Sequence, residues 1–420
     1  MQPSRAPNLV YADDQGRILD HPGWGMAMAD GRGVLRPPVG DLVPLPEGSD
    51  LFLLPGRGPL GFARGRRGPA GPLGRGTAVA AFMAPAWLRY ALPAFETGPE
   101  APLLPLYAYS AVGWADDRFW VPAERIDPDI RQDLGGFDLD EVERSARARV
   151  SAAPGDDLLA HLADCALERK CPAARNFFLG RWEAPLPSSS GCNSACVGCI
   201  SEQPDDRTPT FGRIPFHPSA EALASLAIPH LDAAEGAIVS FGQGCEGEPR
   251  LVADTLAESI RLMREATPRG TINMNTNGSR PAGVETLCRA GLGAIRVSIN
   301  SARKATYDAY YLPRGYAFEE VLESLRVVKR HGGHTSVNWL AFPGVSDRVH
   351  EIEAIVAMAR NVELDLIQVR NLNIDPALYL DCLGEGWAEG AGEARGMAEM
   401  MRVLRRELPD VSFGYFNPPV

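Results

Sequence analysis

The feature that most constrains the fold is a regular alternation of predicted strands and helices that begins near residue 215. Strands are expected at 237–242, 271–276, 295–300, 336–341 and 365–370, and helices at 219–231, 251–266, 284–290, 318–331 and 349–360. Alternation of this kind gives a parallel sheet with right-handed crossover connections. A later helix, 394–408, and a short strand, 411–415, would complete the domain.

Two of these strands alternate polar and apolar residues. The segment Ile295–Asn300 has polar residues at its even positions, and Thr271–Asn277 has them at its odd positions. Successive side chains of a strand point to opposite faces of the sheet, and parallel strands covered on both faces are usually apolar throughout. One face should therefore carry helices while the other borders a polar space. A partial barrel with a polar lumen fits this pattern, and a sheet with one solvated face is the alternative.

Three cysteines precede the alternation in a Cys-x-x-x-Cys-x-x-Cys array, at Cys192, Cys196 and Cys199. A [4Fe–4S] cluster normally takes four thiolates, so three closely spaced thiolates can hold three irons and leave the fourth open to a substrate or cofactor. Tetrahedral zinc also takes four cysteines, or three with one histidine, so a zinc site with a distant fourth ligand is the alternative.

The array and the predicted barrel together resemble the radical SAM superfamily, over roughly residues 185–416, and the resemblance implies a partial (β/α)6 TIM-like barrel. The resemblance implies that the three cysteines hold one [4Fe–4S] cluster, oxygen-sensitive, whose open iron binds S-adenosylmethionine (SAM). It implies reductive cleavage of SAM to methionine and a 5′-deoxyadenosyl radical that abstracts hydrogen from a substrate. It also implies a flavodoxin- or ferredoxin-like electron donor. Such chemistry belongs to the cofactor, and the protein positions and shields it.

Three further segments carry the resemblance and imply the SAM-binding residues. Gly247-Glu248-Pro249 resembles the segment of the family that meets the methionyl amino group of SAM. Asn277 lies in a Thr-Asn-Gly turn like that of the family, and Ser298 and Asn300 match a strand whose polar side chains bind SAM. The chain departs from the family at Glu246, which replaces a glycine, and at Gly198, which replaces an aromatic residue near adenine.

The polar positions of the lumen are candidates for substrate binding: Arg296, Asn338, Gln368 and Arg370. Arginine binds carboxylates and phosphates through two hydrogen bonds, so we expect an anionic small molecule or a peptide as substrate. Arg296 could instead pair with an acidic neighbour or with the carboxylate of SAM. Cys245 is a further candidate, as a thiol near the substrate or as a small buried residue.

The rest of the chain divides into a β-rich domain, 1–135, and a helical connector, 136–184, ahead of the barrel domain, 185–420. Within the first domain we expect strands at 8–12, 17–20, 104–112 and 118–121 and a helix that starts at Pro85. The segment 56–76 is rich in glycine, proline and arginine, which predicts an irregular loop. The connector is expected to be helical over 138–169, with Cys165 on its apolar face.

A formal net charge of −11 argues against a general surface for nucleic acid or anionic membranes. The N-terminal residues lack a signal-peptide pattern, so we expect a cytoplasmic protein without membrane contact, whose eight cysteines stay reduced. Two other functions remain open at this point. One is a non-catalytic iron–sulfur or zinc protein, and the other is a radical SAM enzyme that modifies RNA through the arginine-rich segment.

Overall fold

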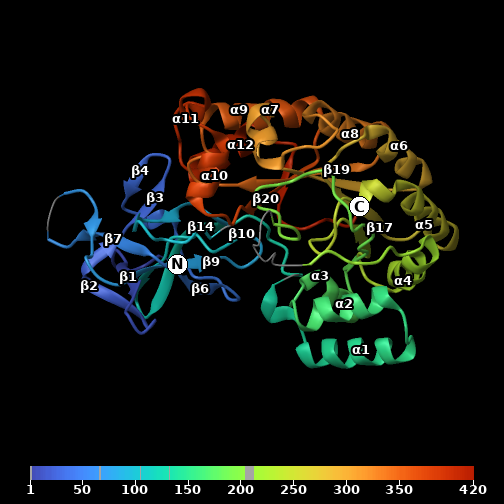
Figure 1. Cartoon of the computed structure of the whole chain (residues 1–420), viewed down its shortest axis with the longest axis horizontal. Coiled ribbons are helices and arrows are strands. Elements are labelled where there is room, and N and C mark those ends of the chain that lie inside the picture. Colours follow the sequence, from blue (N-terminus) through green and yellow to red (C-terminus); the bar gives the residue numbers. More distant parts are fainter. Residues whose placement is uncertain (1, 66–67, 105, 132, 204–211) are drawn as a thin grey trace.

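The computed structural model describes residues 2–65, 68–104, 106–131, 133–203 and 212–420. Figure 1 shows an N-terminal β-rich part at one side and a curled sheet with helices on its outer face at the other. Three connector helices lie beside the curled sheet. None of the helices in the described ranges has both the length and the apolar character that crossing a bilayer requires.

The N-terminal part consists of antiparallel strands in an eleven-stranded sheet and a three-stranded sheet. Its strands are β1 (Asn8–Ala12), β2 (Ile18–Met26), β3 (Met28–Asp30), β4 (Gly33–Leu35), β5 (Leu42–Pro44), β6 (Asp50–Leu53), β7 (Arg57–Ala63), β8 (Gly71–Pro72), β9 (Thr77–Phe82), β10 (Trp87–Arg89), β11 (Leu92–Pro93), β12 (Phe95–Thr97), β13 (Gly113–Ala115) and β14 (Arg118–Arg125). Short 3-10 turns lie at Val39–Asp41 and Leu134–Gly136. The turn between β1 and β2 is closed by the Asp13 carboxylate, which accepts hydrogen bonds from the backbone N–H of Gln15 and Arg17.

Three predictions for this part are wrong. No helix begins at Pro85, because the chain turns there between β9 and β10, with Ala86 at a φ of +71°. Residues 104–112, apart from the undescribed position 105, form an irregular segment, and the strand begins only at Gly113. The segment 56–76 contains β7 and β8, because main-chain pairing with β2 and β12 needs no side chains and tolerates its glycines.

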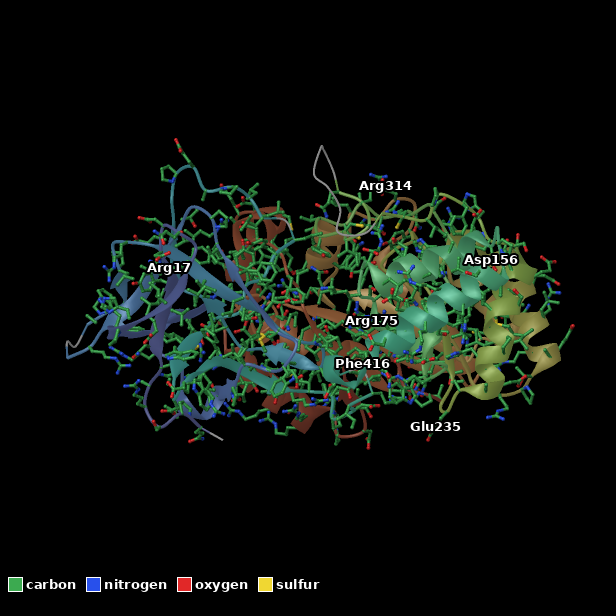
Figure 2. The ribbon with its side chains drawn as sticks, turned by 90° about the horizontal axis from the view of Figure 1, so that it is seen from below. Arg17, Asp156, Arg175, Glu235, Arg314 and Phe416 are labelled. Carbon is green, nitrogen blue, oxygen red and sulfur yellow. The ribbon has the colours of Figure 1, made fainter. Side chains whose placement is uncertain are left out.

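The connector holds three helices, α1 (Leu139–Ala152), α2 (Asp157–Leu167) and α3 (Pro172–Phe178). The predicted continuous helix over 138–169 is interrupted at Gly155, which has a φ of +89°. The Asp156 carboxylate then caps α2 by accepting a hydrogen bond from the N–H of Leu159 at 2.9 Å. Figure 2 shows these helices, around Asp156 and Arg175, at the opposite end of the molecule from Arg17.

The remaining chain forms a seven-stranded parallel sheet whose strands follow one another in sequence order, as in a partial barrel. The strands are β15 (Glu183–Pro185), β16 (Ile238–Phe241), β17 (Thr271–Thr276), β18 (Ala294–Ile299), β19 (His334–Ala341), β20 (Leu366–Asn371) and β21 (Ser412–Gly414). The helices are α4 (Ala220–Ala233), α5 (Ala253–Ala266), α6 (Pro281–Ala290), α7 (Lys304–Tyr311), α8 (Phe318–Arg330), α9 (Val349–Asn361), α10 (Pro376–Leu383), α11 (Trp387–Ala391) and α12 (Met397–Glu407), with a 3-10 turn at Pro249–Val252. The α/β partial barrel with a β-rich N-terminal domain is confirmed.

The polar and apolar residues that alternate along the strands face opposite sides of the sheet, as predicted. In β18, Ile295, Val297 and Ile299 are fully buried under the outer helices, whereas Arg296 and Ser298 are half-buried on the inner face. The parallel register places Ser298 beside Asn338, and Asn338 beside Gln368, so polar side chains from three strands share one level of the lumen.

A buried ion pair joins the N-terminal part to the barrel. The carboxylate of Asp375, at the start of α10, accepts hydrogen bonds from the Arg57 guanidinium at 2.5 Å, the Tyr109 hydroxyl at 3.0 Å and the backbone N–H of Leu104 at 3.0 Å. Arg89 is completely buried and donates to the Asn373 side chain at 2.7 Å, just beyond β20. These contacts hold the N-terminal part against the carboxyl end of a barrel strand, where sites of parallel α/β domains lie.

Candidate functional site

The three array cysteines lie on a loop that follows β15. Two backbone hydrogen bonds join this loop to the segment after β16: the N–H of Gly247 donates to the Ser189 carbonyl at 2.6 Å and that of Glu248 to the Gly191 carbonyl at 2.7 Å. A Cβ at position 247 would lie 1.9 Å from the Gly191 oxygen. Gly247 is therefore required because the two main chains touch at this point.

Glu246 joins the same two segments with its side chain. One carboxylate oxygen accepts hydrogen bonds from the N–H of Gly242 and Gln243, both at 2.7 Å. The other accepts from the N–H and hydroxyl of Ser188 and from the N–H of Ser189, at 2.7–3.0 Å. Burial raises the pKa of Glu246 to about 7, against the effect of these donors. This residue, noted in the sequence only as a departure from the family, organises the start of the cysteine loop.

Glu248 and Asn277 are brought together with the loop. The Glu248 carboxylate accepts hydrogen bonds from the Thr276 hydroxyl at 2.5 Å and the N–H of Asn277 at 2.7 Å. The Asn277 amide donates to the side chains of Asn193 at 2.7 Å and Ser194 at 3.1 Å. Both residues are buried, and these contacts give them a bracing role; direct contact with a cofactor stays a prediction.

The three array thiols interact with one another. Burial, with smaller contributions from Cys199 and Cys192, raises the pKa of Cys196 well above its ordinary value. Burial and then the carboxylate of Glu248 raise the pKa of Cys192. The three array sulfur atoms do not all lie within 4.8 Å of one another, which is wider than the ligand spacing of one tetrahedral zinc ion and suits a four-iron cluster, in which each thiolate binds a different iron.

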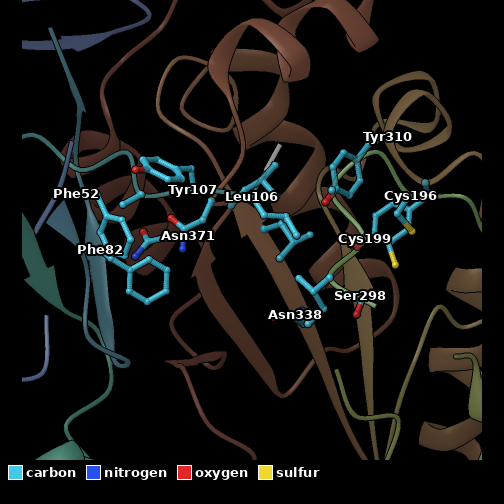
Figure 3. Close-up of a pocket in the computed structure, with 17 residues that line it drawn as sticks. Phe52, Phe82, Leu106, Tyr107, Cys196, Cys199, Ser298, Tyr310, Asn338 and Asn371 are labelled. Carbon is cyan, nitrogen blue, oxygen red and sulfur yellow. The ribbon is translucent and has the colours of Figure 1, made fainter. Parts of the chain in front are cut away.

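A cavity of about 500 Å³ opens beside Cys196 and Cys199 (Figure 3). Ser298 and Asn338 from β18 and β19 and Tyr310 from α7 form its inner wall, near the cysteines. Phe52, Phe82, Leu106 and Tyr107 of the N-terminal part and Asn371, Leu372 and Asn373 from the end of β20 line the other side. Phe52 packs edge-on against Tyr107, with ring centroids 5.3 Å apart.

Tyr310 explains the departure at Gly198. A Cβ at position 198 would lie 2.7 Å from the Tyr310 hydroxyl, so the tyrosine already occupies the space that a side chain there would need. Tyr310 lines the cavity next to Cys196 and Cys199. The aromatic surface that the array lacks in sequence is thus supplied from α7, where no sequence motif marks it.

Of the polar lumen candidates, the structure brings Ser298 and Asn338 to the cavity. The Asn338 side-chain oxygen is buried without a hydrogen-bond partner, so it is available to a ligand. Asn300 is not among the residues that line the cavity; its amide donates to the Thr306 carbonyl at 3.0 Å and the Tyr379 hydroxyl at 3.1 Å. Its contacts are those of a residue that holds α7 and α10 in place.

Arg296, Gln368 and Arg370 are not among the described residues that line the cavity, so a role of theirs in substrate binding stays a prediction. Arg296 donates to Gln368 at 3.2 Å and to Asn417 at 3.4 Å, and burial lowers its pKa to about 9. Arg370 donates to the Tyr415 carbonyl at 2.6 Å and stacks on its ring. Asn417 and Tyr415 of the C-terminal segment each accept one hydrogen bond from these arginines, while the Nε atoms of Arg296 and Arg370 are buried without a partner.

Cys245 lies away from this cavity. Its thiol is buried against Cys165 of α2, and His161 completes a group whose three ligand atoms lie within 4.8 Å of one another. The prediction that Cys165 lies on an apolar helix face is confirmed by its place in the core, but no sequence pattern connects it with Cys245.

The family model of the radical SAM superfamily matches residues 186–359, which include the cysteine loop and the four barrel strands β16 to β19. This stretch is a radical SAM domain. The family implies a [4Fe–4S] cluster and SAM as cofactors. No curated protein sequence matches the chain.

Solved structures that match part of the chain include native anSMEcpe with bound AdoMet, at 17% identity over 55% of this chain and 68% of that chain, with a TM-score of 0.35. They also include SuiB of Streptococcus suis bound to precursor peptide SuiA, at 13% identity over 58% of this chain and 53% of that chain, with a TM-score of 0.39. Methylornithine synthase (PylB) matches at 14% identity over 66% and 77%, with a TM-score of 0.38.

The residues of the radical SAM domain fit the cofactors that the family implies. The three thiols share one loop, and Cys196 and Cys199 face a cavity large enough for organic ligands. The unpartnered Asn338 oxygen and the half-buried Ser298 hydroxyl offer polar contacts within that cavity.

Proposed function

We propose that the protein is a radical SAM enzyme in which Cys192, Cys196 and Cys199 hold one [4Fe–4S] cluster and the adjoining cavity holds SAM and the substrate. When bound, the cluster supplies the electron that cleaves SAM to methionine and a 5′-deoxyadenosyl radical. The observation that carries the proposal is the cavity, because it opens on two of the three array cysteines and lies at the carboxyl ends of the barrel strands.

The residues around the cavity have separate tasks in this proposal. Gly247 and Glu246 hold the cysteine loop in position through main-chain contacts, and Glu248 and Asn277 connect it to the end of β17. Ser298 and Asn338 offer hydrogen bonds to SAM or substrate. The aromatic residues of the N-terminal part cover the cavity and exclude water, which protects a radical from side reactions.

The lining of the cavity indicates the class of substrate. None of the described residues that line it carries a charge, and the side formed by the N-terminal part is aromatic and apolar, with Asn371 and Asn373 beside it. We therefore propose a substrate with an apolar or aromatic group beside a neutral polar one, as in a peptide side chain or an uncharged metabolite, in place of the anionic substrate expected from Arg296 and Arg370. A flavodoxin- or ferredoxin-like protein as electron donor and a cytoplasmic location belong to the same proposal.

The test of the reaction is anaerobic. The protein is reconstituted with iron and sulfide, reduced with dithionite, mixed with SAM and assayed for 5′-deoxyadenosine. Formation of this product should require Cys196, and Cys196→Ala should abolish it. Cys288→Ala is the matched control, because Cys288 is a half-buried cysteine of α6 outside the cysteine loop. Native protein that contains zinc in the array and no iron would contradict the proposal.

A second experiment tests whether the aromatic side of the cavity contacts the substrate, by comparing two exposed apolar side chains. Phe82 lines the cavity and Leu19 of β2 does not, and each is 40% exposed. Phe82→Ala should weaken turnover of the substrate, but the variant should still form 5′-deoxyadenosine when no substrate is present. Leu19→Ala should change neither the turnover nor the formation of 5′-deoxyadenosine. Equal turnover by both variants would contradict a substrate role for the aromatic wall.

A further inference from the structure

A second group of metal-ligating side chains lies outside the radical SAM site. His161 and Cys165 project from α2 of the connector, and Cys245 lies after β16, 80 residues further along the chain than Cys165. In the part of the chain that the structure describes, this is the one group of three or more such residues whose ligand atoms all lie within 4.8 Å of one another. Cys165 and Cys245 are 3% and 8% exposed.

The geometry matches a single ion. His161 and Cys165 are four residues apart on one helix face, so both point in one direction. The His161 Nε2 and the Cys165 Sγ are 3.4 Å apart. Bond lengths of about 2.3 Å to sulfur and about 2.0 Å to nitrogen place such ligands roughly 3.6 Å apart on a tetrahedral zinc ion.

The same spacing argues against a second iron–sulfur cube. Each thiolate of a four-iron cluster binds a different iron, so its ligands stand further apart than those of one ion. Two thiolates and one imidazole are also a ligand set that zinc accepts, with a fourth position for water or another residue. Cys171 is placed nearby, since its backbone N–H donates to the Cys165 carbonyl at 2.9 Å.

The surroundings are those of a closed, structural site. Phe216 packs edge-on against the His161 ring, with centroids 6.2 Å apart and an interplanar angle of 78°. The Cys245 carbonyl accepts a hydrogen bond from the N–H of Ile214 at 3.0 Å. None of the three ligand residues lines the cavity beside the array. An ion here would contact the connector and the barrel without reaching substrate.

We propose that His161, Cys165 and Cys245 bind one zinc ion that fastens α2 to the segment carrying Glu246, Gly247 and Glu248. Cys245 directly precedes Glu246, whose carboxylate organises the start of the cysteine loop. The ion thereby holds the helical connector against the part of the radical SAM domain that positions the array. Binding two thiolates neutralises the charge of the ion within a buried site, which stabilises both.

The first test uses the full chain with Cys192→Ser, Cys196→Ser and Cys199→Ser, so that the array binds no metal. Under reducing, anaerobic conditions we expect this parent to bind one Co²⁺ per chain, with the visible bands of tetrahedral cobalt–thiolate coordination, and to exchange it for Zn²⁺. Cys165→Ser with Cys245→Ser should abolish the bands, and His161→Ala should weaken binding at least tenfold. Cys288→Ser with Cys382→Ser is the control and should leave them unchanged.

The second test uses the protein with its array intact, so that the result does not depend on the folding of the parent variant. Metal analysis of natively isolated protein should find one zinc per chain, which Cys196→Ala leaves in place and Cys165→Ser removes. A folded, reduced parent that binds no Co²⁺ would overturn the proposal. So would acid-labile sulfide in that parent, or a Cys165–Cys245 disulfide found by mass spectrometry in protein isolated without oxidant.

Discussion

Replacement of Gly247 by alanine tests whether the cysteine loop depends on direct main-chain contact. The added Cβ would lie 1.9 Å from the Gly191 oxygen and 2.5 Å from its carbonyl carbon, whereas real Cβ contacts stay beyond 3.0 Å. The two main chains must therefore separate by about 1 Å. Both partners are backbone atoms, so no side-chain rotation can relieve the contact.

The separation breaks the two hydrogen bonds that join the segments, from Gly247 to Ser189 and from Glu248 to Gly191. At about 1 kcal/mol of net stabilisation each, their loss costs about 2 kcal/mol, which shifts the balance between formed and opened loop by roughly 30-fold. Because the array cysteines lie on this loop, we expect Gly247→Ala to lose most of its iron and its [4Fe–4S] absorbance after anaerobic reconstitution, and to lose 5′-deoxyadenosine formation with them.

Gly244→Ala is the matched control, three residues away in the same segment. Its added Cβ would lie 2.7 Å from the end of the Ile200 side chain, which is 41% exposed and can move aside. We expect wild-type iron content from this variant. Wild-type iron, absorbance and 5′-deoxyadenosine formation in Gly247→Ala would refute the reasoning, as would an equal loss in both variants.

Three further perturbations test other parts of the structure. Glu246→Ala leaves several buried donors without a partner and should lower the free energy of unfolding by about 3 kcal/mol or more, measured by urea denaturation, with loss of bound iron. Asp375→Ala leaves Arg57 buried without its counter-charge and should cost about 3–5 kcal/mol in the same assay; a cost under about 1 kcal/mol would contradict a buried pair. Burial lowers the pKa of His230, against the effect of the Trp182 carbonyl, which lies 2.6 Å from its Nε2 and favours the protonated ring. Below about pH 6.5 the His230 imidazole takes up a proton more readily in the unfolded chain than in the folded one, so the free energy of unfolding should fall as the pH drops. His230→Asn should make the free energy of unfolding of the apo protein less dependent on pH in this range.

The fold of the radical SAM domain could be predicted because its signals are local. Each strand of the barrel carries its own apolar face, and the alternation in Ile295–Asn300 follows from the two-residue period of a strand. The array is local as well, since Cys192, Cys196 and Cys199 lie within one loop. The N-terminal part and the connector were harder, because the chain turns at Ala86 and at Gly155, where a helix was expected.

The site was predicted less completely, because its parts come from distant segments. Arg296 and Arg370 had suitable side chains in suitable strands, but the C-terminal residues Tyr415 and Asn417 each accept one of their hydrogen bonds. Conversely, Tyr310 was not predicted as a site residue, because no sequence motif surrounds Tyr310, yet its hydroxyl occupies the space beside Gly198.

By itself, the sequence determined the alternation of strands and helices, the faces of the strands at 271–276 and 295–300, and the loop that carries the three cysteines. All of these depend on spacing along the chain. Only the tertiary structure decided that Phe82 and Tyr107 cover the cavity and that Cys245 meets His161 and Cys165. Such contacts depend on how parts of the chain that are far apart in sequence pack together. Arg57 and Asp375 form a buried ion pair that joins the N-terminal part to the barrel. No periodic pattern in the sequence predicts that these two residues meet.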